Sequence, residues 1–219
     1  MTDPARRFAA VIFDMDGVLL DSEPLHHTVL NGVLDETDGY AVPDAEYEDF
    51  IGTTTERMFA SLIQRHGFRL TAPEYIERYD AAILNALRQP LDPLPGVVAL
   101  LDRLATMGVP LGVASSSKRA WVDATVRSLG LSDYFAVMIS GDDVTHGKPD
   151  PAIYALSAAR LDVPAARCLA IEDAPHGVAS ARAAGMTVLG VRTPYTEHLV
   201  LEGVWRIVDS LEEVDPNDF

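Results

Sequence analysis

Short apolar runs separated by longer helical segments are the feature that most limits the fold of this 219-residue chain. Most of the runs are apolar at nearly every position, which is typical of strands covered on both faces of a parallel sheet. They lie at 9–13, 110–114, 136–140, 168–171 and 187–191, with 206–208 as a sixth candidate. The alternation of strand and helix predicts an open α/β fold with a Rossmann-like parallel sheet as its core.

The segments between these runs have the apolar periodicity of helices that pack on a sheet. Two of them, 95–108 and 118–130, each have one apolar stripe and a glycine at the end. Segments 151–163 and 176–186 complete the alternation. The two stripes consist of Val97, Leu101 and Leu104, and of Val122, Val126 and Leu129.

Residues 23–91 interrupt this alternation directly after the first run. They contain no convincing strand, only three helical patterns at about 22–39, 53–67 and 72–89, and the proline-rich stretch 89–96 then leads back to the sheet. We therefore predict an α/β core formed by residues 1–22 and 92–219, with an all-helical domain, 23–91, inserted into it.

Composition limits the partners and the compartment. The chain has 33 acidic and 17 basic residues, a formal charge of −16 and a pI near 4.6, so its surface repels nucleic acids and anionic membranes. No apolar run approaches the ~20 residues that span a bilayer, and we identify no signal peptide. Cys168 is the only cysteine, which excludes an internal disulfide. We expect a cytoplasmic protein, either a monomer or a weak homo-oligomer.

Charged and hydroxyl side chains gather where the predicted strands end. Each has an ordinary explanation: aspartates and glycines form turns, serines and acids cap helices, and lysines lie on surfaces. Taken together they favour one site, because the carboxyl ends of parallel strands meet at one edge of the sheet and ligands bind there. The residues are Asp14 and Asp16 after the first run, Ser115, Ser116, Ser117 and Lys118 after the second, Lys148 before a helix, and Glu172 and Asp173 after the fourth.

Four carboxylates at one edge repel one another unless a cation joins them, and sites made of oxygen ligands suit Mg²⁺. A bound Mg²⁺ in turn attracts a phosphate. Phosphoryl transfer needs charge neutralisation, hydrogen-bond donors and an in-line nucleophile, and this set of residues supplies all three.

Four motifs resemble those of the haloacid dehalogenase superfamily. They are "DMDGVLLDSE" from Asp14, "GVASSSK" from Gly112, "GKPDP" from Gly147 and "AIEDAPHGVASARAAGM" from Ala170, in the order and spacing of that family. The resemblance covers residues 8 to about 191. It is strongest to the branch of β-phosphoglucomutase-like phosphatases, which insert a helical cap after the first motif.

The resemblance implies a role for each core residue. Asp14 would be the nucleophile that attacks phosphorus, and Asp16 the general acid and base, whose backbone carbonyl also binds the metal. Ser115 would hydrogen-bond the phosphoryl group and Lys148 would neutralise its charge. Mg²⁺ would be bound by Asp14, Asp16, Asp173 and, directly or through water, Glu172. The expected activity is hydrolysis of a small phosphate monoester, such as a sugar phosphate, through an aspartyl-phosphate intermediate.

The cap of such enzymes closes over the site and selects the substrate. Candidates for substrate binding are Glu23, His26 and Arg57 in the cap, the last within a loop at 52–57, and Ser116, Ser117 and Lys118 in the core. An ordinary surface histidine remains an alternative for His26, and an ion pair with a neighbouring acid remains one for Arg57.

Three other functions compete with a phosphatase. The first is a phosphosugar mutase. In the mutases that this branch resembles, the cap loop carries an arginine three residues after its glycine. This chain has Thr55 there and Arg57 two residues later, which disfavours a mutase without excluding it. A dehalogenase lacks the second aspartate, and Asp16 is present. A phosphoacceptor signalling module carries its phosphorylated aspartate on a central strand and has no helical insertion, and we expect this chain to differ in both respects.

Overall fold

The computed structural model describes residues 7–196, 198–215 and 217. These residues divide between two compact units, which we call the sheet unit (1–21 and 90–219) and the helical unit (22–89). The predicted insertion, 23–91, corresponds to the helical unit, which begins one residue earlier and ends two residues earlier. Each unit is described by itself below.

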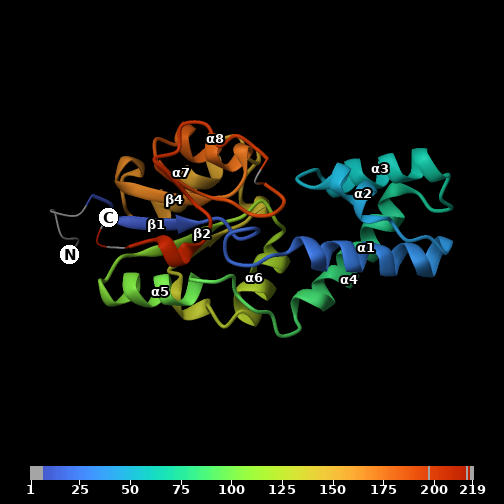
Figure 1. Cartoon of the computed structure of the whole chain (residues 1–219), viewed down its shortest axis with the longest axis horizontal. Helices are drawn as coiled ribbons and strands as arrows, with labels where there is room; N and C mark the ends of the chain where they lie inside the picture. The colour runs from blue at the N-terminus through green and yellow to red at the C-terminus, as the bar shows by residue number, and fades with distance from the viewer. Residues whose placement is uncertain (1–6, 197, 216, 218–219) are drawn as a thin grey trace. The chain divides into compact units, whose positions relative to one another are not determined.

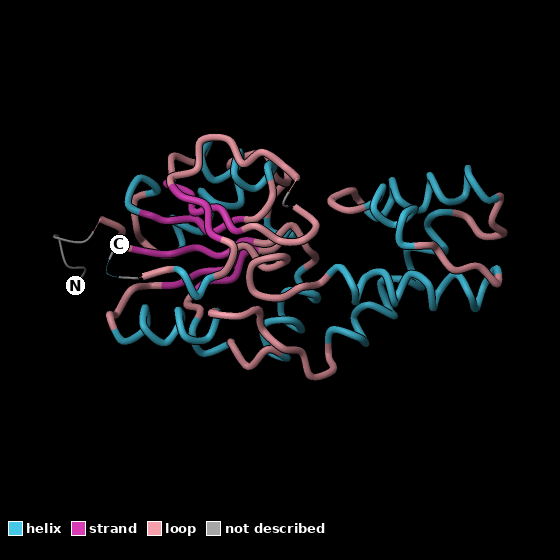
Figure 2. Tube along the Cα trace, in the orientation of Figure 1, coloured by secondary structure: helices cyan, strands magenta, loops and turns pink. Residues whose placement is uncertain are grey.

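Among the described residues, the sheet unit has six parallel strands in the order β3-β2-β1-β4-β5-β6. Figures 1 and 2 show these strands gathered in one sheet. The predicted α/β fold is confirmed, and the observed strands differ from the predicted runs by at most one residue at either end. β4 is one residue longer than predicted and includes Glu172. The strands are β1 (Ala10–Phe13), β2 (Leu111–Ala114), β3 (Val137–Ile139), β4 (Cys168–Glu172), β5 (Thr187–Val191) and β6 (Arg206–Val208).

Helices cover both faces of this sheet (Figure 1). Val11 and Phe13 of β1 face an apolar layer that includes side chains of α5 (Val97–Thr106) and α6 (Arg119–Ser128). Ala10 and Ile12 face the opposite layer, to which α7 (Ala152–Arg160) and α8 (Pro175–Ala183) contribute. Strands buried on both sides have no polar face, which explains the continuous apolar runs. Both predicted helical stripes are buried: Val97, Leu101, Leu104, Val122, Val126 and Leu129.

The position of β1 corrects one expectation. β1 pairs with β2 on one side and with β4 on the other, so it is a central strand. The aspartate that follows it therefore occupies the same kind of position as the phosphorylated aspartate of a signalling module. Of the two expected differences from such a module, only the inserted helices remain.

The helical unit contains the three predicted helices and one that the sequence did not indicate. α1 (Glu23–Asp38), α3 (Thr55–His66) and α4 (Ala72–Leu87) correspond to the predicted patterns. The additional helix, α2 (Asp44–Tyr47), has four residues, which is too short for an apolar repeat to appear. A 3-10 turn, Glu48–Phe50, follows it directly.

Short 3-10 turns lie between the elements of the sheet unit, at Ser132–Tyr134, Gly141–Asp143, Ala165–Arg167 and Leu211–Glu213. None of the helices that the structure describes is both long enough and apolar enough to span a membrane.

Candidate active site

The candidate site lies at the carboxyl ends of β1 and β4. The order in which the chain connects the strands reverses between these two strands. The chain proceeds from β1 outward to β2 and β3, then returns to β4 on the other side of β1. The loops that leave β1 and β4 therefore diverge and leave room for a ligand between them. Asp14 follows β1, and its amide donates to the Ile171 carbonyl of β4 (2.9 Å). Glu172 is the last residue of β4, so the two carboxylates are neighbours.

Lys148 joins these two carboxylates. Its Nζ lies 2.9 Å from Oδ1 of Asp14 and 2.6 Å from Oε1 of Glu172. The lysine side chain is 8% exposed and that of Glu172 is fully buried. Burial by itself would lower the pKa of Lys148, but attraction to Asp14 and Glu172 outweighs it and raises the pKa above its ordinary value. The raised pKa favours the protonated, positively charged form of Lys148.

Asp173 adds a third carboxylate. One oxygen each of Asp14, Glu172 and Asp173 lies within 4.8 Å of the other two, and all three residues are buried. Burial, followed by the negative charge of Glu172, raises the pKa of Asp14 to about 7. Burial, followed by the charges of Asp14 and Glu172, raises the pKa of Asp173 to about 9. One lysine does not balance three carboxylates, so the cluster fits a divalent cation that prefers oxygen ligands.

Two glycines make room for this cluster. A Cβ atom at Gly17 would lie 2.2 Å from Oδ2 of Asp173, and Gly17 also has a φ of +76°, which disfavours other residues. Gly177 lies in the first turn of α8, where a Cβ atom would lie 1.9 Å from Oε1 of Glu172. The glycines of "DMDG" and "EDAPHG" are thus required by the close approach of the Asp173 and Glu172 carboxylates.

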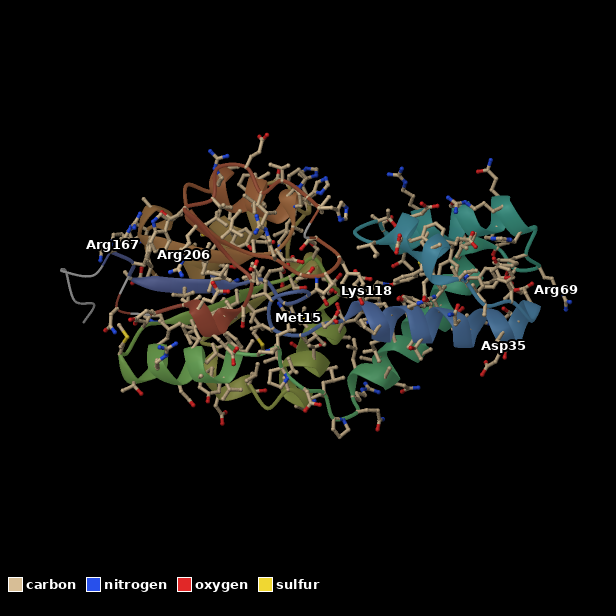
Figure 3. All side chains as sticks on the ribbon, viewed as in Figure 1. Met15, Asp35, Arg69, Lys118, Arg167 and Arg206 are labelled. Carbon is tan, nitrogen blue, oxygen red and sulfur yellow. The ribbon has the colours of Figure 1, made fainter. Side chains whose placement is uncertain are left out.

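Asp16 is turned toward the serines that follow β2. Met15, between Asp14 and Asp16, packs into the apolar layer of α5 and α6 (Figure 3). Asp16 is half-buried, and its Oδ2 accepts a hydrogen bond from Ser117 Oγ (3.1 Å). Ser117 was predicted to bind substrate, but in this structure it contacts the predicted general acid. Its amide also donates to Ser115 Oγ (3.1 Å).

The other predicted residues after β2 differ in their surroundings. Ser115 is fully buried at the end of β2, whereas Ser116 is exposed. Lys118, which is labelled in Figure 3, precedes the first turn of α6. Its Nζ lies 5.6 Å from the centre of the Trp121 ring. The sheet unit therefore brings Asp14, Asp16, Ser115, Ser117, Lys148, Glu172 and Asp173 to one edge.

Comparison with known proteins agrees with this geometry. The family model described as haloacid dehalogenase-like hydrolase matches residues 11–191. The chain belongs to this family. The predicted family, fold class and enzyme class are thereby confirmed, the last also by phosphatases among the relatives of this hydrolase.

Two relatives and one solved structure are similar over most of their length. The fructose-1-phosphate phosphatase YqaB of Escherichia coli is 32% identical over 85% of this hydrolase and 97% of its own chain. The beta-phosphoglucomutase of Bacillus subtilis is 34% identical over 83% of this hydrolase and 82% of its own chain. The crystal structure of CbbY from Rhodobacter sphaeroides in complex with phosphate superposes with a TM-score of 0.84 at 27% identity. The match covers 94% of this hydrolase and 96% of the CbbY chain.

In the helical unit of the hydrolase, two predicted substrate residues have partners within that unit. Oε2 of Glu23 accepts a hydrogen bond from the Tyr47 hydroxyl (2.8 Å). Nδ1 of His26 lies 2.5 Å from the Tyr79 hydroxyl of α4. His26 is therefore half-buried and has a partner, unlike an ordinary surface histidine, and its role in substrate binding stays a prediction.

Arg57 is exposed and lies in a helix rather than in the predicted loop. α3 begins at Thr55, and Thr54 caps it by accepting a hydrogen bond from the Arg57 amide (3.3 Å). The predicted loop 52–57 is therefore wrong for its last three residues. Two helical residues turn by ~200°, so Arg57 and Thr55 face opposite ways. No acid among the described residues lies within ion-pair distance of Arg57, which argues against the ion-pair alternative.

The sequence did not indicate Tyr154, which contacts two site residues. Its hydroxyl donates to Oε1 of Glu172 (2.6 Å), and its ring centre lies 5.1 Å from Nζ of Lys148. Tyr154 stands in an apolar helical segment, where an aromatic residue is an ordinary core residue. No motif distinguishes it, and only the packing of α7 against the sheet brings it to Glu172.

Proposed function

We propose that the protein is a Mg²⁺-dependent phosphatase that hydrolyses a small phosphate monoester through an aspartyl-phosphate intermediate. The proposal rests on one observation above the others: Asp14 is held by Lys148 next to the buried acids Glu172 and Asp173. It is supported by membership of the haloacid dehalogenase-like hydrolases and by a relative named as a sugar-phosphate phosphatase.

In the first step, a carboxylate oxygen of Asp14 attacks the phosphorus atom of the ester. The bond between phosphorus and the ester oxygen breaks as the new bond to Asp14 forms, and the leaving oxygen takes a proton from Asp16. Lys148 offsets the repulsion between Asp14 and the phosphate, while Ser115 donates a hydrogen bond to the phosphoryl group. General acid catalysis of this kind contributes ~10²–10⁴-fold to a rate.

In the second step, Asp16 is ionised and acts as a base. It removes a proton from water, whose oxygen attacks phosphorus, and the bond between phosphorus and Asp14 breaks. The products are inorganic phosphate, the Asp14 carboxylate and a reprotonated Asp16. The hydrogen bond from Ser117 holds the Asp16 side chain in a defined orientation, which supports its assignment to proton transfer.

Asp14, Glu172 and Asp173 would hold the Mg²⁺, with the backbone carbonyl of Asp16. When bound, the cation neutralises charge on the phosphoryl oxygens and stabilises the ionised carboxylates. This second effect matters because burial and the charge of Glu172 raise the pKa of Asp14 in the cation-free protein, which favours the protonated form that is not nucleophilic. Activity lost on chelation and restored by added Mg²⁺ tests this part of the proposal.

The substrate we propose is a small phosphorylated metabolite, a sugar phosphate being the best candidate. The fructose-1-phosphate phosphatase of Escherichia coli supports this class. Selection of the substrate is assigned to Glu23, His26 and Arg57 of a helical cap, with Ser116, Ser117 and Lys118 of the core. A cytoplasmic location accords with such a metabolite. Phosphate release measured over a panel of phosphate esters would identify the preferred substrate.

Two aspartate variants test the mechanism. Asp14→Asn should abolish both turnover and the acid-stable incorporation of phosphate into the protein. Asp16→Asn should lose turnover, yet still be phosphorylated slowly by esters with good leaving groups, which need no proton. Asp133→Asn, the same change at an exposed aspartate, is the control. Wild-type turnover in Asp14→Asn would show that the nucleophile is misassigned.

A phosphosugar mutase is the second candidate, supported by the relative named beta-phosphoglucomutase. A mutase must keep its aspartyl phosphate from water until a sugar hydroxyl arrives, and the helix position of Thr55 lacks the arginine of the mutases that the sequence resembles. We therefore expect free phosphate from β-glucose 1-phosphate with a trace of the 1,6-bisphosphate and Mg²⁺, if this sugar is accepted. Catalytic formation of glucose 6-phosphate without matching phosphate release would instead identify a mutase.

A further inference from the structure

Tyr154 occupies an unusual position for a core tyrosine. It lies in the first turn of α7 and is fully buried. Its hydroxyl donates a 2.6 Å hydrogen bond to Oε1 of Glu172, and Nζ of Lys148 lies 5.1 Å from its ring centre. One side chain therefore contacts both the deepest carboxylate of the site and the lysine that is paired with it.

The two oxygens of Glu172 have different surroundings. Oε1 accepts from the Tyr154 hydroxyl and from Lys148 Nζ, both at 2.6 Å. Among the residues that the structure describes, Oε2 accepts only one contact, from the Ala174 amide at 3.5 Å. The tyrosine thus keeps one oxygen occupied and leaves the other with unused lone pairs. A carboxylate held in this way presents a defined face to a cation.

We propose that Tyr154 is a positioning residue, which fixes the orientation of Glu172 for binding of a divalent cation together with Asp14 and Asp173. The inference rests on the proposed function, because it assigns the cation site to these carboxylates. Residues that hydrogen-bond a metal ligand from behind orient it and typically contribute ~10- to 100-fold to metal affinity. The Tyr154 hydroxyl meets this description, and the missing side chain of Gly177 leaves the space that the Glu172 carboxylate occupies.

The discriminating variant is Tyr154→Phe, which removes the hydroxyl and keeps the ring that packs in the core and faces Lys148. Its matched control is Tyr75→Phe. Tyr75 is also fully buried, and its hydroxyl also donates to a carboxylate, that of Asp38 in the helical unit. Both variants lose one buried hydrogen bond to an acid, so a general loss of stability should appear in both. Only Tyr154→Phe should alter cation binding.

Binding of Mg²⁺ to the substrate-free protein, measured by calorimetry, is the main readout. We expect a dissociation constant about 10-fold higher in Tyr154→Phe and unchanged in Tyr75→Phe. In assays, the Mg²⁺ concentration for half-maximal activity should rise by the same factor, and kcat at saturating Mg²⁺ should stay within about threefold of wild type. An unchanged Mg²⁺ affinity in Tyr154→Phe, with thermal stability lowered as in the control, would overturn the inference and leave Tyr154 a core residue.

The same measurements separate this inference from the proposed function. A wild-type protein that binds Mg²⁺ and hydrolyses phosphate esters, with a Tyr154→Phe variant of equal Mg²⁺ affinity, contradicts the role of Tyr154 alone. A wild-type protein that binds no Mg²⁺ and is active in chelator contradicts the metal-dependent mechanism, and the positioning role with it.

Discussion

The ammonium group of Lys148 lies 2.9 Å from Oδ1 of Asp14, so that a buried ion pair joins two residues 134 positions apart in the chain. The same ammonium group is 2.6 Å from Glu172. Asp173 adds a further carboxylate to this cluster, so that three carboxyl groups surround the single positive charge of Lys148. Its removal should therefore affect stability as well as activity.

Lys148→Ala removes the positive charge that is paired with the buried carboxylates of Asp14 and Glu172. Breaking a buried pair on one side typically costs ~3–5 kcal/mol of unfolding free energy, whereas an exposed pair contributes at most about 1 kcal/mol. We expect a loss in the larger range at pH 8 by urea denaturation in EDTA, and at least a ~10²-fold fall in kcat. Lys118→Ala, at the only other lysine, is the control for stability. Equal and small losses in both variants would show that Lys148 is not held as described.

The stability of the cation-free protein should depend on pH through Asp14 and Asp173. Their pKa values rise from 3.8 to about 7 and about 9, so the folded state binds more protons than the unfolded state between pH ~4 and ~9. Stability contributed by these groups must then fall as the pH rises across this window. Saturating Mg²⁺ should flatten the dependence, because the cation favours the ionised carboxylates.

Urea denaturation in EDTA at pH 5, 7 and 9 measures this effect. The double variant Asp14→Asn, Asp173→Asn provides the reference, since it lacks both titrating groups and retains the rest. The difference in unfolding free energy, wild type minus variant, should decrease steadily with pH. An increase over the same range would contradict the assignment of raised pKa values to this pair.

Gly177→Ala should disturb Glu172 without a backbone cost. The new Cβ atom would lie 1.9–2.1 Å from the carboxylate atoms, so Glu172 must move. We expect weaker Mg²⁺ binding by calorimetry and a higher Mg²⁺ requirement for activity, each by at least about 10-fold. Gly32→Ala is the matched control, because Gly32 lies within α1 with nothing within 4 Å of its new Cβ. It should stabilise the protein by ~0.5–1 kcal/mol and leave Mg²⁺ affinity unchanged. Unaltered Mg²⁺ binding in Gly177→Ala would exclude Glu172 from the cation site.

Arg57→Ala should change substrate selection more than chemistry. Arg57 is exposed in the first turn of α3, where a charged hydrogen bond to a second anionic group of a substrate would contribute about tenfold to its affinity. We expect KM to rise about tenfold for bisphosphates or phosphorylated acids, with little change for simple sugar phosphates. Arg88→Ala, at an exposed arginine of the same unit, is the control. An equal loss of kcat for all substrates would assign Arg57 to folding or catalysis instead.

Several features of this protein were predictable from local patterns in the sequence. Most of the strands were predictable because a strand buried on both faces is apolar at nearly every position. The helices of the sheet unit were predictable because their apolar stripes recur every three to four residues. The set of site residues was predictable because the carboxyl ends of parallel strands meet at one edge of the sheet, where ligands bind. The short α2 was not predictable, since four residues carry no periodic signal.

Contacts between distant residues were decided only by the tertiary structure. The register of β1 against β4 makes Asp14 and Glu172 neighbours, and the packing of α7 brings Tyr154 against Glu172. The sequence also did not indicate that Ser117 contacts Asp16 or that His26 contacts Tyr79. A sequence pattern reports which residues share a face of one element. Hydrogen bonds, burial and pKa depend on which elements meet, and that is determined by the packing of the whole unit.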